Sequence, residues 1–289
     1  MQTQARLKIQ KTYKIFVDGK FPRTESGRYF SFQSRSGEMT ANVSLCSRKD
    51  LRDAVTAARG AQPKWAGATA TNRGQILYRM AEMLETRRAA FREELVWQGQ
   101  TPEQAESEVS ASVDRLVHYA GWADKYQQIF SSVNPVASKH FNFSVLEPVG
   151  VVGLLAPEKY PLLGLISLMA PVLVGGNTCV VLGSESNPLS AISFTEVLGT
   201  SDVPAGVINV LTGKRSELLP HFATHMEINA LVLADGTPEE WLKIEQEAAH
   251  TVRRSAHYQF ADWSVPQAQS PYFILDCQEL KTTWHPIGL

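Results

Sequence analysis

The chain has 289 residues, of which 44% are hydrophobic and 20% are charged. Its 28 Lys and Arg residues nearly balance its 29 Asp and Glu residues, which leaves a net charge of −1. Nucleic acids and anionic membranes attract clustered positive charge, so this balance argues against both as partners. The composition is typical of a globular protein with a sizeable hydrophobic core.

The three cysteines, Cys46, Cys179 and Cys277, are too few and too scattered for a disulfide framework. They form no CxxC pair of the kind that binds zinc. Residues 1–10 lack the apolar stretch of a signal peptide, and the longest apolar region, 162–174, is too short to span a bilayer. We therefore expect a cytoplasmic protein without a metal site.

The first part of the chain, residues 1–140, predicts a hairpin followed by helices. Residues 13–21 alternate around an Asp-Gly pair, which is a signal for a hairpin turn. A capping-box pattern at Ser47 predicts the start of a helix, and an apolar stripe predicts one long helix over 72–97. A further helix is expected from Thr101, where an N-cap residue precedes a proline and Gln104 completes a capping-box pattern. We expect this region to pack on a sheet domain.

From 141 to about 250, apolar β-branched runs alternate with helical patterns. The expected order is strand 149–156, helix 162–174, strand 178–182, helix 189–198, strand 207–211, helix 217–224, strand 230–234 and a helix from Pro238. This alternation predicts an α/β fold with an open, mostly parallel sheet that is covered on both faces. The pattern weakens after 250, although 272–275 and 280–284 are again strand-like.

Several blocks follow one another in a specific order. They are Glu147-Pro-Val-Gly-Val-Val-Gly, Pro157-Glu-Lys-Tyr-Pro, Gly176-Asn-Thr-Cys-Val-Val-Leu and Val203-Pro-Ala-Gly-Val-Ile-Asn-Val-Leu-Thr-Gly. In this order they resemble the aldehyde dehydrogenase superfamily. The resemblance covers roughly five-sixths of the chain and implies a Rossmann-type sheet with N-terminal helices and oligomerisation strands.

A closer resemblance comes from five further blocks, Ser47-Arg-Lys-Asp, Trp65-Ala, Gly121-Trp-Ala-Asp-Lys-Tyr, Leu168-Met-Ala-Pro and Thr283-Trp-His-Pro-Ile-Gly. They are similar to the second, degenerate unit of the two-unit aldehyde dehydrogenases called family 16. That unit is known as a pseudo-domain without catalytic machinery. The resemblance implies that such a unit stands here as a separate chain, with the catalytic domain absent.

Aldehyde oxidation in this family needs a cysteine nucleophile in a Gly-Gln-x-Cys loop of the catalytic domain. The sequence contains no such loop, so we expect no catalytic residue. The family's oxyanion donor is an asparagine in Pro-Trp-Asn-Phe-Pro, and the matching stretch has Lys159 at that position. We interpret Lys159 as a solvated side chain, or as an ion-pair partner of Glu158.

The positions that bind NAD(P) in the family are also altered. Where family members carry a lysine and a glutamate for the ribose, this chain has Gly183 and, in uncertain register, Glu185. Where they hold the pyrophosphate, it has Asp235 and Gly236, followed by a capping box that ends at Glu240. The box satisfies the free N–H groups that would bind a phosphate, and the carboxylates would repel one. We therefore regard these positions as vestigial and expect no cofactor.

Two other pairs of residues could in principle contact a metal or a ligand. His221 and His225 are spaced by one helical turn, but no third ligand is apparent, so a solvated helix face is the more economical interpretation. Trp263 and Trp284 could stack on a ligand, although packing anchors are the default role of such residues.

Two strand-like segments, Phe141–Glu147 and Leu275–Trp284, resemble the strands through which family members associate. Unpaired strand edges need a partner, so we expect a homo-oligomer, or a hetero-oligomer with a full-length aldehyde dehydrogenase. In this interpretation 141–250 is a degenerate dinucleotide-binding-like domain that includes the start of the oligomerisation hairpin, and 251–289 is a C-terminal segment with an oligomerisation strand.

The leading hypothesis is a pseudoenzyme that serves as a structural or regulatory subunit. Two alternatives stay open: a nucleotide-binding sensor that uses the crevice at the carboxyl ends of the strands, and a residual NAD(P)-dependent aldehyde oxidoreductase.

Overall fold

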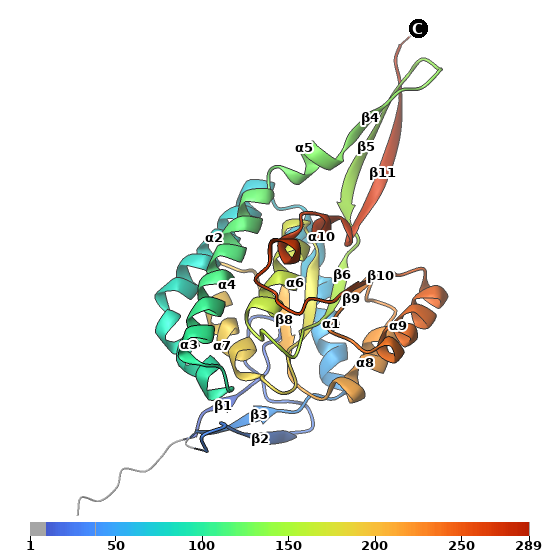
Figure 1. Ribbon diagram of the computed structural model, residues 1–289. Helices are drawn as coiled ribbons and strands as arrows, with labels where there is room; N and C mark the ends of the chain where they lie inside the picture. Colours follow the sequence, from blue (N-terminus) through green and yellow to red (C-terminus); the bar gives the residue numbers. More distant parts are fainter. Residues whose placement is uncertain (1–9, 38, 289) are drawn as a thin grey trace, which may run out of the picture.

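The structure is a computed structural model that describes residues 10–37 and 39–288. Its centre is a five-stranded sheet in which every pair of neighbours is parallel (Figure 1). The strands are β6 (Val151–Leu155), β7 (Thr178–Leu182), β8 (Ile208–Leu211), β9 (Ala230–Ala234) and β10 (Arg254–Tyr258). Their order across the sheet is β10-β9-β6-β7-β8, which confirms the expected α/β fold with an open parallel sheet.

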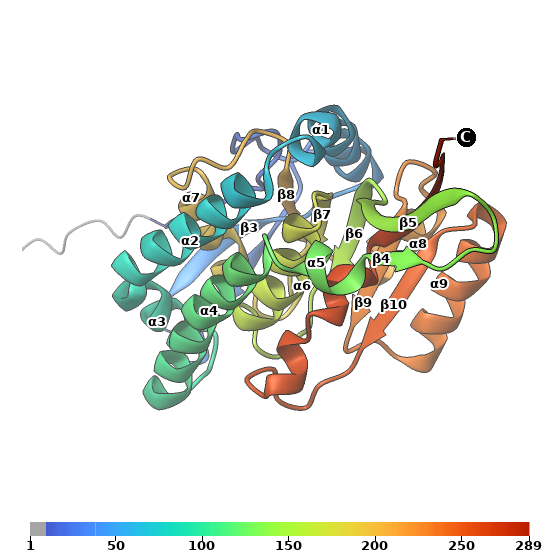
Figure 2. The ribbon, with the colours of Figure 1, turned by 90° about the horizontal axis from the view of Figure 1, so that it is seen from above.

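Helices cover both faces of this sheet (Figure 2). Val152 and Leu154 of β6 point into one hydrophobic cluster, whereas Val151 and Leu155 point into a second cluster on the other face. The first face is covered by α6 (Leu163–Val174) and α7 (Leu189–Leu198), and the second by α1 (Arg48–Ala66), α8 (Arg215–Thr224) and α9 (Pro238–Thr251). Burial on both faces explains why these strands are almost entirely apolar.

A second layer of helices lies outside α6 and α7. It consists of α2 (Ala70–Thr86), α3 (Arg88–Trp97) and α4 (Pro102–Trp122), and the short α5 (Tyr126–Phe130) follows α4 in the chain. The single helix expected over 72–97 is wrong, because the backbone leaves helical geometry at Arg87 (φ −102°, ψ 12°). The capping boxes expected at Ser47 and Thr101 are confirmed. Among the described residues, no helix is long and apolar enough to cross a membrane.

The N-terminal hairpin is only partly confirmed. Asp18 and Gly19 make the expected turn, with φ values of 53° and 71°, and Val17 and Lys20 bond to each other across it. The flanking residues pair elsewhere, so no extended hairpin forms. A small sheet results, in the order β1-β3-β2, from β1 (Thr12–Tyr13), β2 (Tyr29–Gln33) and β3 (Thr40–Ser44).

A three-stranded antiparallel sheet projects from the body of the molecule (Figure 1). Its strands are β4 (Ser132–Asn134), β5 (His140–Pro148) and β11 (Gln278–Pro286), in the order β11-β5-β4. We call it the arm sheet. All nine residues of β11 pair with β5, so the two segments expected as strands are neighbours.

The segment after residue 250 differs from expectation in two ways. The sequence did not predict the polar strand β10. This strand pairs with β9 in the central sheet, so the expected domain boundary at residue 250 falls between two neighbouring strands of one sheet. The strand expected at 272–275 is instead a short helix, α10 (Tyr272–Leu275). Residues 259–277 form a link between β10 and β11 that contains α10 and the 3-10 helix η1 (Pro266–Gln269).

Candidate functional site at the carboxyl edge of the sheet

The strand order places a crevice at the carboxyl edge of the central sheet. The chain runs from β6 outward to β7 and β8 and then returns to β9 on the other side of β6. Such a topological switch point is where open α/β sheets bind ligands. Four loops meet there, at 156–161, 183–188, 212–214 and 235–237, and each follows a strand of the sheet.

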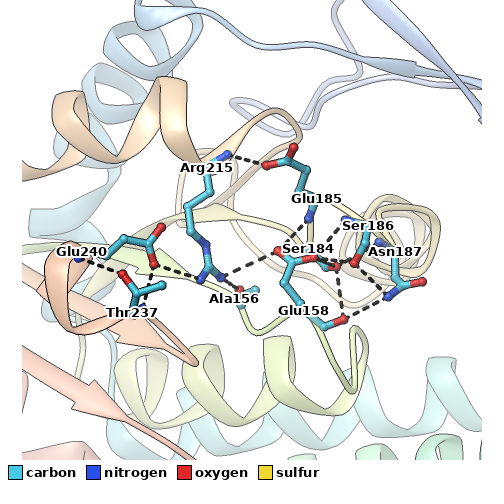
Figure 3. A network of polar contacts seen from close by, with 9 residues as sticks. All are labelled: Ala156, Glu158, Ser184, Glu185, Ser186, Asn187, Arg215, Thr237 and Glu240. Carbon is cyan, nitrogen blue, oxygen red and sulfur yellow. Dashed lines mark hydrogen bonds and ion pairs between the residues drawn. The ribbon is translucent and has the colours of Figure 1, made fainter.

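The carboxylate of Glu158 lies at the centre of this edge and binds the loop after β7 (Figure 3). It accepts hydrogen bonds from the backbone nitrogens of Glu185 (3.1 Å) and Ser186 (2.9 Å) and from the hydroxyls of Ser184 (2.9 Å) and Ser186 (2.5 Å). Burial alone would raise the pKa of Glu158, but these hydrogen bonds outweigh it and lower the pKa. The group is therefore a carboxylate at neutral pH.

Glu185 occupies the N-terminus of α8. Its Oε2 accepts a hydrogen bond of 2.9 Å from the backbone nitrogen of Arg215, the first residue of that helix. A carboxylate is favoured at this place by the free N–H groups and by the helix dipole. A carboxylate of the chain itself is therefore bound at the N-terminus of α8.

The Arg215 side chain crosses the crevice between the loops, with only 12% of it exposed. Its Nη2 donates to the carbonyl of Ala156 and lies 3.9 Å from Glu158 Oε1, while its Nη1 lies 3.8 Å from Glu240 Oε2. Figure 3 shows this guanidinium between the two carboxylates. Arg215 therefore ties the ends of β6, α8 and α9 together.

The N-terminus of α9 is also satisfied by its own residues. Thr237 Oγ1 accepts from the backbone nitrogen of Glu240 (3.2 Å), and Glu240 Oε2 accepts from the backbone nitrogen of Thr237 (3.1 Å). The capping box expected here is confirmed. Both helix N-termini at the crevice are therefore bound to carboxylates or hydroxyls of the chain itself.

The ion pair between Lys159 and Glu158 is not formed, since the Glu158 carboxylate turns toward the 184–186 loop and Arg215. The Lys159 side chain is exposed at the rim of a hollow of about 600 Å³. A flexible, solvated lysine is a poor preorganised donor for an oxyanion.

The other expected cofactor positions are tightly enclosed. An added Cβ at Gly183 would lie 3.0 Å from the Cβ of Ala191, so a longer side chain at this buried position would have to displace α7. An added Cβ at Gly236 would collide with the side chain of Leu233. Asp235 adopts a left-handed backbone (φ 51°), and burial raises the pKa of its carboxyl group. A side chain at Gly183 or Gly236 would therefore have to displace neighbouring side chains.

All three cysteines are buried, and Cys46 lies against the 212–214 loop, where its backbone nitrogen donates to the carbonyl of Thr212 (2.9 Å). Burial raises the pKa of each thiol, and that of Cys277, beside the carboxylate of Asp276, reaches about 12. A thiol that stays protonated at neutral pH is a weak nucleophile.

The two histidines lie at the C-terminal end of α8, and the two tryptophans differ in burial. His221 lies in α8 and His225 follows its last residue, and the described part of the chain contains no group of three potential metal ligands. Trp263 is fully buried in the 259–277 link, as expected for a packing anchor. Trp284 differs, because 57% of it is exposed on β11.

Sequence reasoning missed Arg215 and the role of Glu158. The signal for Arg215 was its position, since it follows a strand and a Thr-Gly pair and opens a helix at the carboxyl edge. The partners of Glu158 lie 26 to 28 residues away on another loop, and no local pattern indicates such a contact.

Comparison with known proteins identifies the family to which the chain belongs. The sequence profile described as "Aldehyde dehydrogenase family" matches residues 22–256, most of the chain. The chain belongs to the aldehyde dehydrogenase family. A relative described as the putative aldehyde dehydrogenase DhaS of Bacillus subtilis is 30% identical over 261 residues, which are 88% of this chain and 52% of that protein. Human retinal dehydrogenase 2 is 33% identical over 242 residues, 82% of this chain and 46% of the relative.

Solved structures of the family share the fold. An aldehyde dehydrogenase of Bacillus cereus, solved as an NAD+ complex, matches with a TM-score of 0.81 and 26% identity over 86% of this chain and 51% of that one. The chain thus spans about half the length of each of these three proteins.

Proposed function

We propose that this chain is a non-catalytic member of the aldehyde dehydrogenase family that acts as a structural or regulatory subunit. The observation that carries the proposal is the occupation of the carboxyl-edge crevice by the chain's own charges. Glu158, Glu185 and Glu240 surround Arg215, and two of these carboxylates sit at helix N-termini. A dinucleotide phosphate would have to displace them and overcome their repulsion.

The state of the thiols supports the same proposal. By resemblance, aldehyde oxidation requires a thiolate that attacks the carbonyl carbon. All three cysteines are buried, and burial holds their pKa values far above neutral pH. None of them can present a thiolate to a carbonyl beside the crevice.

The link between β10 and β11 gives further support. Three side chains of α4 donate to its backbone: Arg115 to the carbonyls of Trp263 (2.8 Å) and Ala268 (2.5 Å), His118 to that of Gln269 (2.9 Å), and Tyr119 to that of Ser270 (3.0 Å). Trp263 is fully buried beneath them. The link is thus a packed part of the fold. It joins the central sheet directly to the arm sheet, at the place between β10 and β11 where the family resemblance would put a catalytic domain.

The arm sheet supports association as the positive role. Eight of the nine residues of β11 are exposed, and its outer edge has no strand partner among the described residues. An exposed edge of this kind favours pairing with another chain. We propose that β5 and β11 carry contacts with a second copy or with a full-length aldehyde dehydrogenase. The cytoplasmic location and the closer likeness to the family 16 unit stay predictions.

The test combines turnover with association. Purified chain is mixed with NAD+ or NADP+ and a panel of aliphatic and aromatic aldehydes, and NADH or NADPH fluorescence is followed, with a full-length aldehyde dehydrogenase as the positive control. We expect no cofactor reduction above that of the buffer. Gel filtration alone and with full-length enzymes should then show a complex. Aldehyde-dependent cofactor reduction by the chain alone would contradict the proposal.

A further inference from the structure

The small sheet of β1, β2 and β3 lies at one end of the molecule and has two different faces (Figure 1). Tyr13, Phe32 and Val43 lie on its inner face, where they are part of the hydrophobic core. Side chains alternate along a strand, so the residues next to these three lie on the outer face. The outer-face residues include Thr12, Tyr29, Ser31, Asn42 and Ser44. The outer face therefore presents mainly hydroxyl and amide groups.

A hollow of about 280 Å³ lies over this outer face, and three cationic residues line it. Lys14 follows β1, and Arg23 and Arg28 lie on either side of the turn at residues 24–27. None of the described residues that line the hollow is an Asp or a Glu. Three positive charges around one hollow, with no carboxylate in its wall, favour the binding of an anion.

The turn between the two arginines is held in place by hydrogen bonds. The hydroxyl of Thr24 donates to the carbonyl of Arg28 (3.1 Å), and the backbone nitrogen of Gly27 donates to the carbonyl of Thr24 (3.0 Å). The backbone nitrogen of Glu25 donates to the Asp50 carboxylate (2.8 Å), which belongs to the capping box of α1. The backbone of the turn is thus fixed before a ligand binds, which lowers the entropic cost of binding.

Two of the three cations have no partner within the described part of the chain. The side chains of Lys14 and Arg23 form neither a hydrogen bond nor an ion pair there. Arg28 donates to Glu217 Oε2 (3.2 Å), and Glu217 also lies 3.6 Å from Lys214. Two cations thus share the charge of that carboxylate, and the hollow keeps an excess of positive charge.

Neutral donors of the outer face are also unpaired. The hydroxyls of Thr12 and Ser44 and the Nδ2 of Asn42 donate no hydrogen bond to a described residue. Only 6% of Ser44 is exposed, so its hydroxyl has little access to bulk water. A buried donor gains free energy when an acceptor pairs with it, and an anion with several oxygens can pair with several such groups at once.

We infer that this hollow binds a small phosphate monoester. Such a group carries nearly two negative charges at neutral pH and has three strong acceptor oxygens. The guanidinium of Arg23 suits two of these oxygens, and the ammonium of Lys14 adds a point charge. The volume is at the lower limit for small-molecule sites, so the hollow admits a compact metabolite and not a dinucleotide.

The site is separate from the crevice at the carboxyl edge of the central sheet. None of its described lining residues belongs to the four loops that meet at that edge. The inference therefore goes beyond the non-catalytic role and does not depend on it.

Calorimetric titration of the full chain with glycerol 2-phosphate, at constant ionic strength, tests the site. We expect a one-to-one isotherm with a dissociation constant below about 1 mM, and competition by inorganic phosphate. Arg23→Gln should raise the dissociation constant at least about tenfold. Arg92→Gln removes a cation that is 53% exposed on α3, outside the hollow, and should leave it unchanged. No saturable heat up to about 10 mM, or an equal loss in both variants, would overturn the inference.

Ser44→Ala separates binding from folding. The hydroxyl has no partner in the described chain, so its removal should leave the midpoint of thermal unfolding unchanged. The same substitution should raise the dissociation constant for glycerol 2-phosphate about threefold to tenfold, because the phosphate loses a donor. Wild-type affinity in Ser44→Ala would overturn the placement of the phosphate on the outer face of the sheet.

A lipid headgroup can present the same phosphate monoester at a membrane surface. Cosedimentation of the chain with vesicles that contain phosphatidic acid distinguishes this source from a free metabolite. We expect the chain to stay in the supernatant. Cosedimentation that Arg23→Gln abolishes would assign the hollow to a lipid and overturn its assignment to a small metabolite.

Discussion

The carboxylate of Glu185 accepts a 2.9 Å hydrogen bond from the backbone nitrogen of Arg215, and so a loop that follows β7 closes the N-terminus of α8. Glu158 holds the same loop from the other side through the backbone nitrogen of Glu185. The edge of the crevice is therefore stabilised by hydrogen bonds between residues of the chain itself.

Replacing Glu185 by Gln should destabilise the protein modestly. The charge at the N-terminus of α8 is lost while the side chain keeps its size, which should lower the free energy of unfolding by about 0.3–1 kcal/mol at low salt. High salt should reduce the difference, because the charge is near the surface. Urea denaturation measures both, and Glu245→Gln on the exposed face of α9 serves as the matched control. An effect no larger than that of the control would show that the contact is unimportant.

Glu158 should make stability depend on pH. Its pKa is lowered in the folded protein, so its contribution is full above the unfolded value of about 4.3 and is lost as the pH falls through the folded value. Because 38% of the side chain is exposed, we expect Glu158→Gln to cost only about 1 kcal/mol at pH 7. The difference from wild type should shrink below about pH 4. Denaturation series from acidic to neutral pH check this, and a difference that grows on acidification would contradict it.

Arg115 should be essential for the order of the 259–277 link. Arg115→Met keeps an apolar stem but leaves the carbonyls of Trp263 and Ala268 and the hydroxyl of Ser167 without their donor. We expect a loss of about 2–4 kcal/mol in the free energy of unfolding. Hydrogen exchange should speed up in residues 263–270 more than in the central sheet. Arg79→Met, at an exposed position of α2, is the control and should have little effect.

The thiols should be unreactive in the folded protein. Cys46, Cys179 and Cys277 are buried, and burial raises the pKa of each thiol, so almost no thiolate is present at pH 8. A disulfide reagent should label the native chain far more slowly than the chain unfolded in urea, where three thiols should react. Rapid labelling of one native cysteine would identify an accessible thiol and weaken the non-catalytic proposal.

Local patterns predicted much of this fold. The capping boxes at Ser47, Thr101 and Thr237 depend on residues three positions apart, and the structure confirms all three. The apolar strands β6 to β9 were found for a similar reason, since burial on both faces requires apolar residues in sequence. A feature that depends only on residues within one helical turn or one strand can therefore be predicted from the sequence.

Features that depend on contacts between distant parts of the chain could not be predicted from the sequence. Residues 272–275 form an apolar run too short to distinguish a strand from a helix, and in the folded chain they form α10 with Phe273 and Ile274 buried. The polar strand β10 was missed because it lies at the sheet edge and is partly exposed. At the crevice, the positions Gly183, Glu185, Asp235 and Gly236 came from the family resemblance. The contacts of Arg215 join two loops and the first turn of α9, and no local pattern predicts them.

Calorimetric titration of the purified chain with NAD+, and separately with NADP+, tests the closed crevice most directly. We predict no saturable heat of binding at ligand concentrations up to about 1 mM, while a full-length aldehyde dehydrogenase under the same conditions gives a normal isotherm. A one-to-one isotherm with a dissociation constant below about 100 µM would show that the carboxylates yield to a dinucleotide, and would contradict the account.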